Sequence, residues 1–139
     1  MSSDTDKAPK EKAPEETAPQ EKTRPPVWIG HVALKTPDLD ASANFMETVG
    51  LRPIFRGDEV VVLELRGGTH LILQPGEAGS AEFDFMVEDL DASHTAMAGS
   101  GYTVSEIERG RIHDTFRVTE PGGNVIRVNS THVPDHDAV

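Results

Sequence analysis

The stretch Asp38-Leu39-Asp40-Ala41-Ser42 occurs a second time as Asp89-Leu90-Asp91-Ala92-Ser93, 51 residues further along the chain. Gly50 recurs as Gly101 at the same shift. Each copy follows a short apolar stretch, and its aspartates are suited to begin a helix because a carboxylate accepts the free N–H groups of the first turn. An internal repeat determines the architecture of a chain. Two copies predict one compact domain built from two similar halves.

The first half, about residues 27–75, alternates short apolar stretches with turn residues. In residues 59–66 (EVVVLELR) the alternation of side chains is typical of a strand with one buried face. A helix is expected from Asp38 or Asp40 to Gly50, since glycine favours the left-handed conformation that ends a helix. Strands are expected at residues 28–35, 51–55, 59–66 and 69–74.

The second half, about residues 80–130, repeats this order. A helix is expected from Asp89 or Asp91 to about Gly99, and residues 120–124 (EPGGN) are a turn sequence. Strands are expected at residues 82–87, 102–107, 114–119 and 125–129. Each half is therefore predicted to be strand–helix–strand–strand–strand, which makes an α+β fold of two tandem βαβββ modules.

The two ends of the chain differ in composition from the domain between them. Residues 1–26 contain five prolines, many Lys and Glu, and almost no apolar side chains. Such a segment buries too little surface to offset the entropy of ordering, so a disordered tail is expected, either a solvated leader or an interaction tail. Residues 131–139 are expected to be a frayed tail in which His132 and His136 are solvated.

Charge and cysteine content limit the possible partners. The chain of 139 residues has a formal net charge of −11 and no cysteine. An acidic domain repels phosphate backbones and anionic membranes, so we expect neither nucleic acid nor membrane as a partner, and instead a small molecule or a protein. No apolar run reaches the roughly 18 residues of a membrane span, and no signal peptide is recognisable. A cytoplasmic location is the expectation.

The segments GHVAL at 30–34 and EPGGNVIRV at 120–128, with DLDAS after the first strand of each half, resemble the vicinal-oxygen-chelate superfamily. This superfamily includes glyoxalase I, extradiol dioxygenases and the bleomycin-binding proteins. The resemblance covers about residues 27–130. It implies that the strands curve into a mixed sheet around a cavity and that the protein is a homodimer, within which modules commonly pair.

The resemblance also implies four positions for metal ligands, one on the first and one on the last strand of each module. In this sequence they are His31, Ile72, Glu82 and Arg127. Isoleucine has no lone pair and a guanidinium has no acceptor, so only His31 and Glu82 are able to bind a metal. A catalytic metal normally has about three protein ligands. We therefore expect an incomplete metal site and no cofactor.

An atypical metal site is the alternative, with Ni, Zn, Mn or Fe as the ion. It would use His31 and Glu82 together with His70 or Glu64. Recruiting His70 requires a strand register that the pattern of residues does not support. Such a protein would be a glyoxalase- or dioxygenase-type lyase, isomerase or oxygenase.

Alternation predicts which side chains share the face of His31. That face is charged, whereas the opposite face is apolar and must be covered by the helices. The predicted companions of His31 are Lys35, Glu64, Arg66, His70, Gln74, Glu82, Asp84, Thr115, Arg117, Arg127 and Asn129.

Several roles are open for these residues. Arg127 either pairs with Glu82 or binds a carboxylate or phosphate of a ligand, which its planar fork suits. Glu82 is the candidate general base if the protein is an enzyme. Three roles are open for His31: it binds a ligand, it acts as a base, or it is a vestige of the metal site that is hydrogen-bonded to a neighbouring residue. Glu64 is expected to pair with Arg117 across strands.

Two further histidines complete the candidates. His70 belongs with His31, Glu64, Arg117 and Arg127 in the predicted ligand-binding set. His113 is expected in a surface turn or a lid before the strand at 114–119.

Three functions follow from these residues. The first is binding of a small polar or anionic molecule in the cavity without a complete metal site. The second is the metal-dependent enzyme with an atypical ligand set. The third is an interaction module whose cavity is vestigial and whose surface or N-terminal tail makes the contacts. Fold alone does not decide among them.

Overall fold

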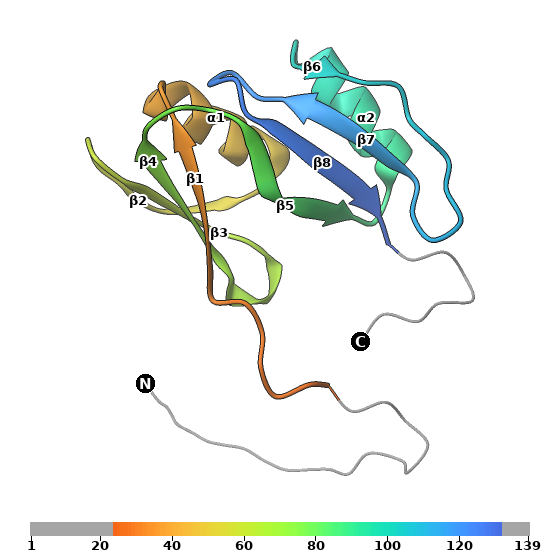
Figure 1. Cartoon of the computed structure of the whole chain (residues 1–139), viewed down its shortest axis with the longest axis horizontal. Helices are drawn as coiled ribbons and strands as arrows, with labels where there is room; N and C mark the ends of the chain where they lie inside the picture. Colours follow the sequence, from red (N-terminus) through yellow and green to blue (C-terminus); the bar gives the residue numbers. More distant parts are fainter. Residues whose placement is uncertain (1–23, 132–139) are drawn as a thin grey trace.

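The computed structural model describes residues 24–131, and the repeat of the sequence is the repeat of the structure (Figure 1). The first module consists of β1 (His31–Thr36), α1 (Leu39–Val49), β2 (Arg52–Arg56), β3 (Val61–Glu64), the short turn η1 (Arg66–Gly68) and β4 (His70–Pro75). The second consists of β5 (Ser80–Val87), α2 (Leu90–Gly99), β6 (Thr103–Val104), β7 (Thr115–Thr119) and β8 (Val125–Ser130).

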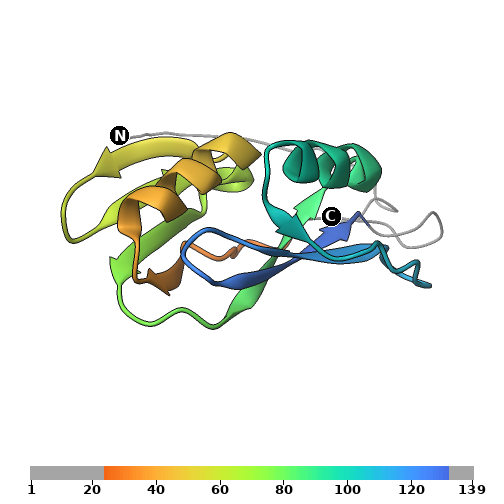
Figure 2. The ribbon, with the colours of Figure 1, turned by 90° about the horizontal axis from the view of Figure 1, so that it is seen from above.

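Each module forms its own four-stranded mixed sheet. Sheet A has the strand order β1-β4-β3-β2, and sheet B has the corresponding order β5-β8-β7-β6. The first and last strands of each module are parallel, and the other neighbours are antiparallel. The two sheets lie side by side, and each is covered by its own helix (Figure 2). The predicted α+β fold of two βαβββ modules is confirmed.

The first aspartate of each repeated pentapeptide caps its helix. Asp38 Oδ1 accepts a hydrogen bond from the backbone N–H of Ala41 at 3.1 Å, and Asp89 Oδ1 accepts one from Ala92 at 3.0 Å. These contacts satisfy donors that have no partner inside the helix. Gly50 follows α1 with a φ of 120°, which a residue with a side chain rarely adopts.

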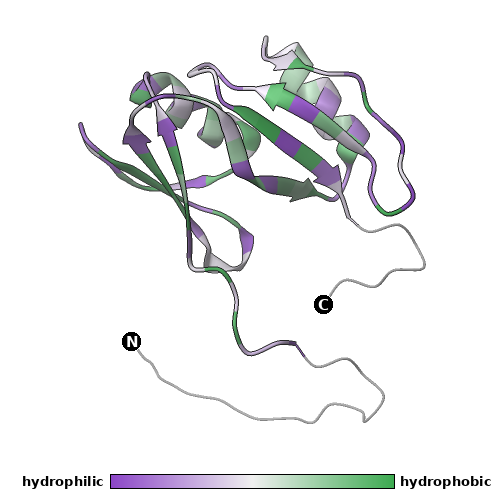
Figure 3. Cartoon of the chain, viewed as in Figure 1, coloured by the Kyte–Doolittle hydropathy of each residue, from purple (hydrophilic) through white to green (hydrophobic). Residues whose placement is uncertain are grey.

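The core lies between each sheet and its helix. Figure 3 shows apolar and polar residues alternating along β7 and β8, as expected for strands with one buried face. Full burial of a large apolar side chain contributes about 1.5–3 kcal/mol, so this face accounts for most of the stabilisation. The strands contribute Leu34, Val61, Leu63, Leu71, Leu73, Phe85, Phe116, Val118, Ile126 and Val128, and the helices contribute Ala43, Phe45, Met46, Leu90 and Met97. Neither helix is long and apolar enough to cross a membrane in the part of the chain described.

A buried carboxylate joins the two modules. Glu120, in the turn between β7 and β8, is 1% exposed and accepts hydrogen bonds from the Ser42 hydroxyl, the Asn124 side chain and two backbone N–H groups. Asn124 Nδ2 also donates to the carbonyl of Lys35 in β1 at 2.8 Å. A Cβ atom at Gly122 would overlap Thr36 Oγ1, so this turn requires glycine.

Two predicted strands are shorter in the structure. The first strand was expected from Trp28 but begins at His31, because β4, its only neighbour, begins at His70 opposite it. The strand expected at 102–107 is reduced to Thr103–Val104. There the hydroxyl of Ser105 accepts the backbone N–H of Arg117, which replaces a regular ladder bond.

The predicted tails fall mostly beyond the described residues. Only residues 24–26 of the predicted tail 1–26, and Thr131 of the predicted tail 131–139, lie within them. His132 and His136 lie outside the described residues.

Candidate functional site

Four polar side chains lie in one row across the uncovered face of sheet A. Strand pairing places His31 opposite His70, His70 opposite Glu64, and Glu64 opposite Arg52. We call these four residues the histidine row. The sequence pattern disfavoured a register that joins His31 to His70, and this expectation was wrong. Ile72 instead lies opposite Ala33, one pleat further along β1.

The members of the histidine row contact one another in sequence across the sheet. The rings of His31 and His70 are 5.8 Å apart between centroids and meet edge to face. His70 Nε2 lies 3.7 Å from Glu64 Oε2, and Arg52 Nε donates to Glu64 Oε1 at 2.9 Å. The hydrogen bond from Arg52 holds the pKa of Glu64 below its ordinary value, an effect that desolvation opposes and the charge on His70 reinforces. The charged form of Glu64 is therefore favoured beside His70.

Arg52 is the residue of this row that sequence reasoning missed. The sequence feature that could have indicated Arg52 is its position on β2, because β2 pairs with β3, the strand that carries Glu64. The predicted ion pair between Glu64 and Arg117 is wrong, because these residues belong to different sheets. Arg117 Nη1 instead lies 4.0 Å from Glu108 Oε2.

A second polar row crosses the uncovered face of sheet B. Pairing places Asp84 of β5 opposite Arg127 of β8, and Arg127 opposite Arg117 of β7. We call these three residues the arginine row. Asp84 also forms a hydrogen bond with the amide of Asn129, which keeps its carboxylate on this face.

The side chain of Arg127 makes no hydrogen bond or ion pair with any residue in the range 24–131. The predicted pair with Glu82 does not form in the structure. The register of β5 and β8 is irregular between Ser80 and Asp84, so Asp84 and not Glu82 is the cross-strand partner of Arg127. Glu82 is exposed.

The arginine row places two arginines opposite each other on neighbouring antiparallel strands. Residues directly opposite on antiparallel strands have Cβ atoms about 4.5–5.5 Å apart, and like charges there are destabilising. Both Arg117 and Arg127 are exposed. Glu108 lies at the limit of an ion pair with Arg117, whereas Asp84, opposite Arg127 in register, makes no ion pair with it within residues 24–131. An anion with two oxygens is the natural counter-charge for such a pair.

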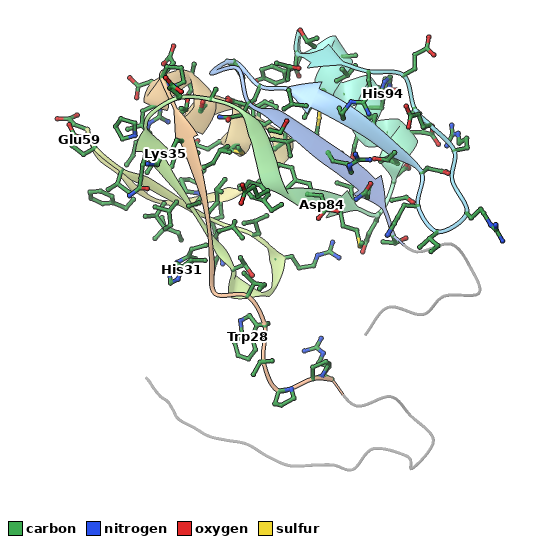
Figure 4. The ribbon with its side chains drawn as sticks, viewed as in Figure 1. Trp28, His31, Lys35, Glu59, Asp84 and His94 are labelled. Atoms are coloured by element: carbon green, nitrogen blue, oxygen red, sulfur yellow. The ribbon has the colours of Figure 1, made fainter. Side chains whose placement is uncertain are left out.

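The four metal-ligand positions are not brought together in one chain. His31 lies on sheet A and Glu82 on sheet B, and no strand of one sheet pairs with a strand of the other in the described part. Figure 4 shows His31 and Asp84 on these separate ribbons. Among residues 24–131 no three His, Asp or Glu side chains are placed to hold one metal ion. The residues of a single chain do not fit the metal centre implied by the superfamily.

The other candidates have structural contacts. His113 is half-buried, and its Nδ1 lies 2.8 Å from the carbonyl oxygen of Ser130, so it joins the loop before β7 to the end of β8. The same loop is held by Arg109, which pairs with Asp91 at 2.8 Å and Asp114 at 3.0 Å.

Comparison with known proteins identifies the fold. No family model matches the chain, and no curated protein matches it in sequence. A lactoylglutathione lyase from Agrobacterium tumefaciens is similar in structure, with a TM-score of 0.65 and 22% identity over 77% of this chain and 96% of the other. A possible glyoxalase from Bacillus cereus has a TM-score of 0.61 and 25% identity over 73% and 97%. An antibiotic-binding protein from Streptomyces has a TM-score of 0.65 and 19% identity over 76% and 96%.

These three structures have the arrangement described above for this chain. Others that match are described as members of the glyoxalase/bleomycin resistance protein/dioxygenase superfamily. The resemblance seen in the sequence is confirmed at the level of the fold. Because the fold includes both enzymes and binding proteins, function must be argued from the two polar rows.

Proposed function

We propose that this chain, with the glyoxalase/bleomycin-resistance fold, binds a small anionic molecule through Arg117 and Arg127 and needs no metal ion to do so. The observation that carries the proposal is the cross-strand pairing of these two arginines, of which Arg127 has no partner within residues 24–131. A bound anion would remove the repulsion between the guanidinium groups.

Carboxylate and phosphate are the chemical groups that fit. A guanidinium donates two parallel hydrogen bonds to either group, and such charge-assisted bonds are roughly twice as strong as neutral ones. The chain carries a net charge of −11, so a paired positive site is a local exception to its overall field.

The surroundings of the arginine row favour a polar ligand body. Asn129 lies opposite Thr115 in the next cross-strand pair, and Asp84 lies at the end of the row. Asn129 is buried with its amide bound to Asp84, and the Thr115 hydroxyl donates to the carbonyl of Val128, so the exposed carboxylate of Asp84 is the polar group nearest to a ligand that reaches past the arginines. No aromatic ring belongs to the row, so it is not built to stack a planar molecule.

The residues at the metal-ligand positions support binding without a metal. Arg127 has a fixed positive charge at a position where the superfamily has a metal-binding side chain. Ile72 has an apolar side chain at another of these positions. The alternative, a metal-dependent lyase, isomerase or dioxygenase, is favoured by a different observation. His31, His70 and Glu64 are neighbours in register on sheet A.

A homodimer is part of the proposal. The two rows lie on different sheets of one chain, and no hydrogen bond or ion pair among the described residues connects them. A second chain would be needed to place the histidine row of one copy opposite the arginine row of the other.

The test is binding of inorganic phosphate and of small mono- and dicarboxylates by calorimetry, with the protein treated with a chelator. We expect binding that persists after chelation and weakens about tenfold or more in Arg127→Ala, in line with the roughly 1.5–3 kcal/mol of a charged hydrogen bond. Arg111→Ala is the matched control, because Arg111 is exposed and its side chain makes no hydrogen bond or ion pair within residues 24–131.

Two results would contradict the proposal. One is equal affinity in Arg127→Ala and Arg111→Ala, which would leave only a general charge effect. The other is binding that appears only when Ni, Zn, Mn or Fe is restored and that is lost in His31→Ala, which would support the metal-dependent alternative.

A further inference from the structure

The two modules differ in the connection between their second and third strands. In the first module residues 57–60 join β2 to β3, whereas in the second module residues 105–114 join β6 to β7. Figure 1 shows this second connection as a long excursion beside β7. We call residues 105–114 the module-two loop. A connection longer than two antiparallel strands need is a common place for functional residues.

The start of the module-two loop is bonded to β7 and to α2. The backbone N–H of Ser105 donates to the carbonyl of Arg117 at 2.8 Å, and its hydroxyl accepts the backbone N–H of Arg117 at 2.8 Å. On the other side, His94 Nε2 lies 2.8 Å from the carbonyl oxygen of Ser105. Ser105 is therefore fixed beside Arg117 of the arginine row.

Glu108 continues the pairing along β7. Its backbone N–H donates to the carbonyl of Thr115 at 2.8 Å, and its carbonyl accepts the N–H of Thr115 at 2.9 Å, so these two residues lie directly opposite each other. Thr115 and Arg117 are two residues apart on β7, and side chains at that spacing share a face. Glu108 therefore lies on the uncovered face of sheet B, diagonal to Arg117.

The residues after Glu108 are clamped to the domain. Arg109 pairs with Asp91 of α2 at 2.8 Å and with Asp114 at 3.0 Å. Hydrogen bonds from the backbone of Gly110 and from Arg109 hold the pKa of Asp114 below its ordinary value. The hydrogen bond to Asp91 and that to Asp114 raise the pKa of Arg109. The clamp is therefore held in its charged form, and it fixes the backbone that carries Glu108.

The side chain of Glu108 reaches the arginine row. Its Oε2 lies 4.0 Å from Arg117 Nη1, and the two side chains are 65% and 44% exposed. No other carboxylate of residues 24–131 forms an ion pair with Arg117. An exposed pair at this distance is weak, so the guanidinium stays available to a ligand. A carboxylate this close nevertheless acts on the charge of any group that binds there.

The charges at the arginine row balance before a ligand binds. The row contributes two guanidinium groups and the carboxylate of Asp84, and Glu108 adds a second carboxylate. A singly charged ligand group leaves one uncompensated negative charge there, and a doubly charged group leaves two. Because the Coulomb energy is proportional to the charge of the ligand, Glu108 opposes the doubly charged group twice as strongly.

We infer that Glu108 is a specificity-determining residue of the arginine row. It favours ligands whose anionic group carries one negative charge, such as a carboxylate or a phosphodiester, over ligands whose group carries two, such as a phosphate monoester. The inference rests on the proposed function of the arginine row. It adds to that proposal the charge of the ligand group and the residue that selects it.

Sulfate and methyl sulfate test the inference, because both have a tetrahedral head and they differ by one charge. Their dissociation constants are measured by calorimetry on the full chain after chelation, at one ionic strength, since salt screens exposed charges. Removing the charge with Glu108→Gln nearly preserves the shape of the side chain. Interactions between exposed charges correspond to about a 1.5-fold to fivefold change in affinity. Glu108→Gln should raise the affinity for methyl sulfate by such a factor, and the affinity for sulfate by about the square of that factor.

Two further variants separate charge from structure. Glu108→Asp keeps the carboxylate and should keep the wild-type ratio of the two affinities. Glu106→Gln is the matched control, because it removes one charge from the same loop. Glu106 is exposed, and its side chain makes no hydrogen bond or ion pair within residues 24–131. This variant should also keep the wild-type ratio.

Two results would overturn the inference. One is a change of equal size for both anions in Glu108→Gln, or no change, because a charge effect must grow with the charge of the ligand. The other is the same change of ratio in Glu106→Gln, which would indicate the general field of the domain.

Arg127→Ala distinguishes these failures from failure of the anion site. If Arg127→Ala weakens binding of both anions while Glu108→Gln leaves their ratio unchanged, only the role of Glu108 is wrong. If neither the wild-type protein nor Glu108→Gln binds either anion in a way that depends on Arg127, the proposed function and the role of Glu108 are both wrong.

Discussion

Ser42 Oγ donates a hydrogen bond to Glu120 Oε1 at 2.6 Å, between residues 78 positions apart in the chain. It connects the first turn of α1 to the turn between β7 and β8, and both side chains are buried. The contact fixes the second module against the first.

Ser42→Ala should lower the free energy of unfolding by about 1–3 kcal/mol, since a buried carboxylate loses one of its donors. Urea unfolding measures this. Ser93→Ala is the control supplied by the repeat, because Ser93 occupies the same place in α2 and its hydroxyl makes no hydrogen bond within the described residues. Equal losses in the two variants would show that helix position, and not Glu120, determines the effect.

Asp38→Ala should lower the free energy of unfolding by about 1 kcal/mol, because the N–H of Ala41 loses its cap. Asp38→Asn should retain most of that stability, since an asparagine oxygen also accepts this hydrogen bond. Thermal or urea unfolding of both variants checks the prediction. A loss of similar size in Asp38→Asn would mean that charge at the helix terminus matters more than the hydrogen bond.

The carboxyl of Glu64 should titrate below its ordinary value of 4.5, because Arg52 donates to it. A depressed folded-state pKa gives stability that is present above the pKa of the unfolded chain and is lost as the pH falls through the folded-state pKa. This contribution should therefore begin to fall as the pH drops below 4.5 and should be gone once the pH is below the lower, folded-state pKa. Carbon-detected NMR measures the titration of the Glu64 carboxyl group directly, separately from the other carboxyl groups.

Arg52→Ala should move that titration back towards the ordinary value. Arg56→Ala is the matched control, because Arg56 lies on the same strand but contacts Glu47 and Asp40. An unchanged titration in Arg52→Ala would show that His70 accounts for the shift.

Arg127→Gln should slightly stabilise the protein in the absence of anions, by a few tenths of a kcal/mol, because it removes one of two like charges opposite each other. The gain should shrink in high salt, which screens exposed charges. Urea unfolding at low and high ionic strength measures it, with Arg111→Gln as the reference. Destabilisation by Arg127→Gln at low salt would indicate that Arg127 already has a stabilising partner in the protein without ligand.

The fold was predictable from local features. The repeated pentapeptide, the alternation in β3 and the glycine after α1 each act over a few residues, and all of them agree with two βαβββ modules. What these local features did not predict is where a side chain interrupts a strand. The hydroxyl of Ser105 accepts a hydrogen bond from a backbone N–H of β7, and β6 ends before this residue. The periodicity of residues 102–107 does not predict this interruption.

The candidate site was predicted in composition but not in arrangement. The faces of His31, Glu64 and Arg127 followed from alternation, whereas the ion pairs expected for Glu64 and Arg127 did not form. The expected pair of Glu64 with Arg117 joined residues of different sheets, and the expected pair of Arg127 with Glu82 assumed a register of β5 and β8 that the irregularity between Ser80 and Asp84 changes. Which sheet a strand joins depends on contacts between distant segments, and a single sequence does not display them.

The sequence by itself determined the repeat, the helix caps and the identity of the buried face, because these depend on periodicity and on neighbours a few residues away. Only the tertiary structure decided that His31 lies beside His70, that Arg127 lies beside Arg117, and that Glu120 receives the hydroxyl of Ser42. The physical reason is the period of a strand. Sliding one strand by two residues leaves every side chain on the same face, so the pattern fits several registers equally well, and packing of the whole domain selects one.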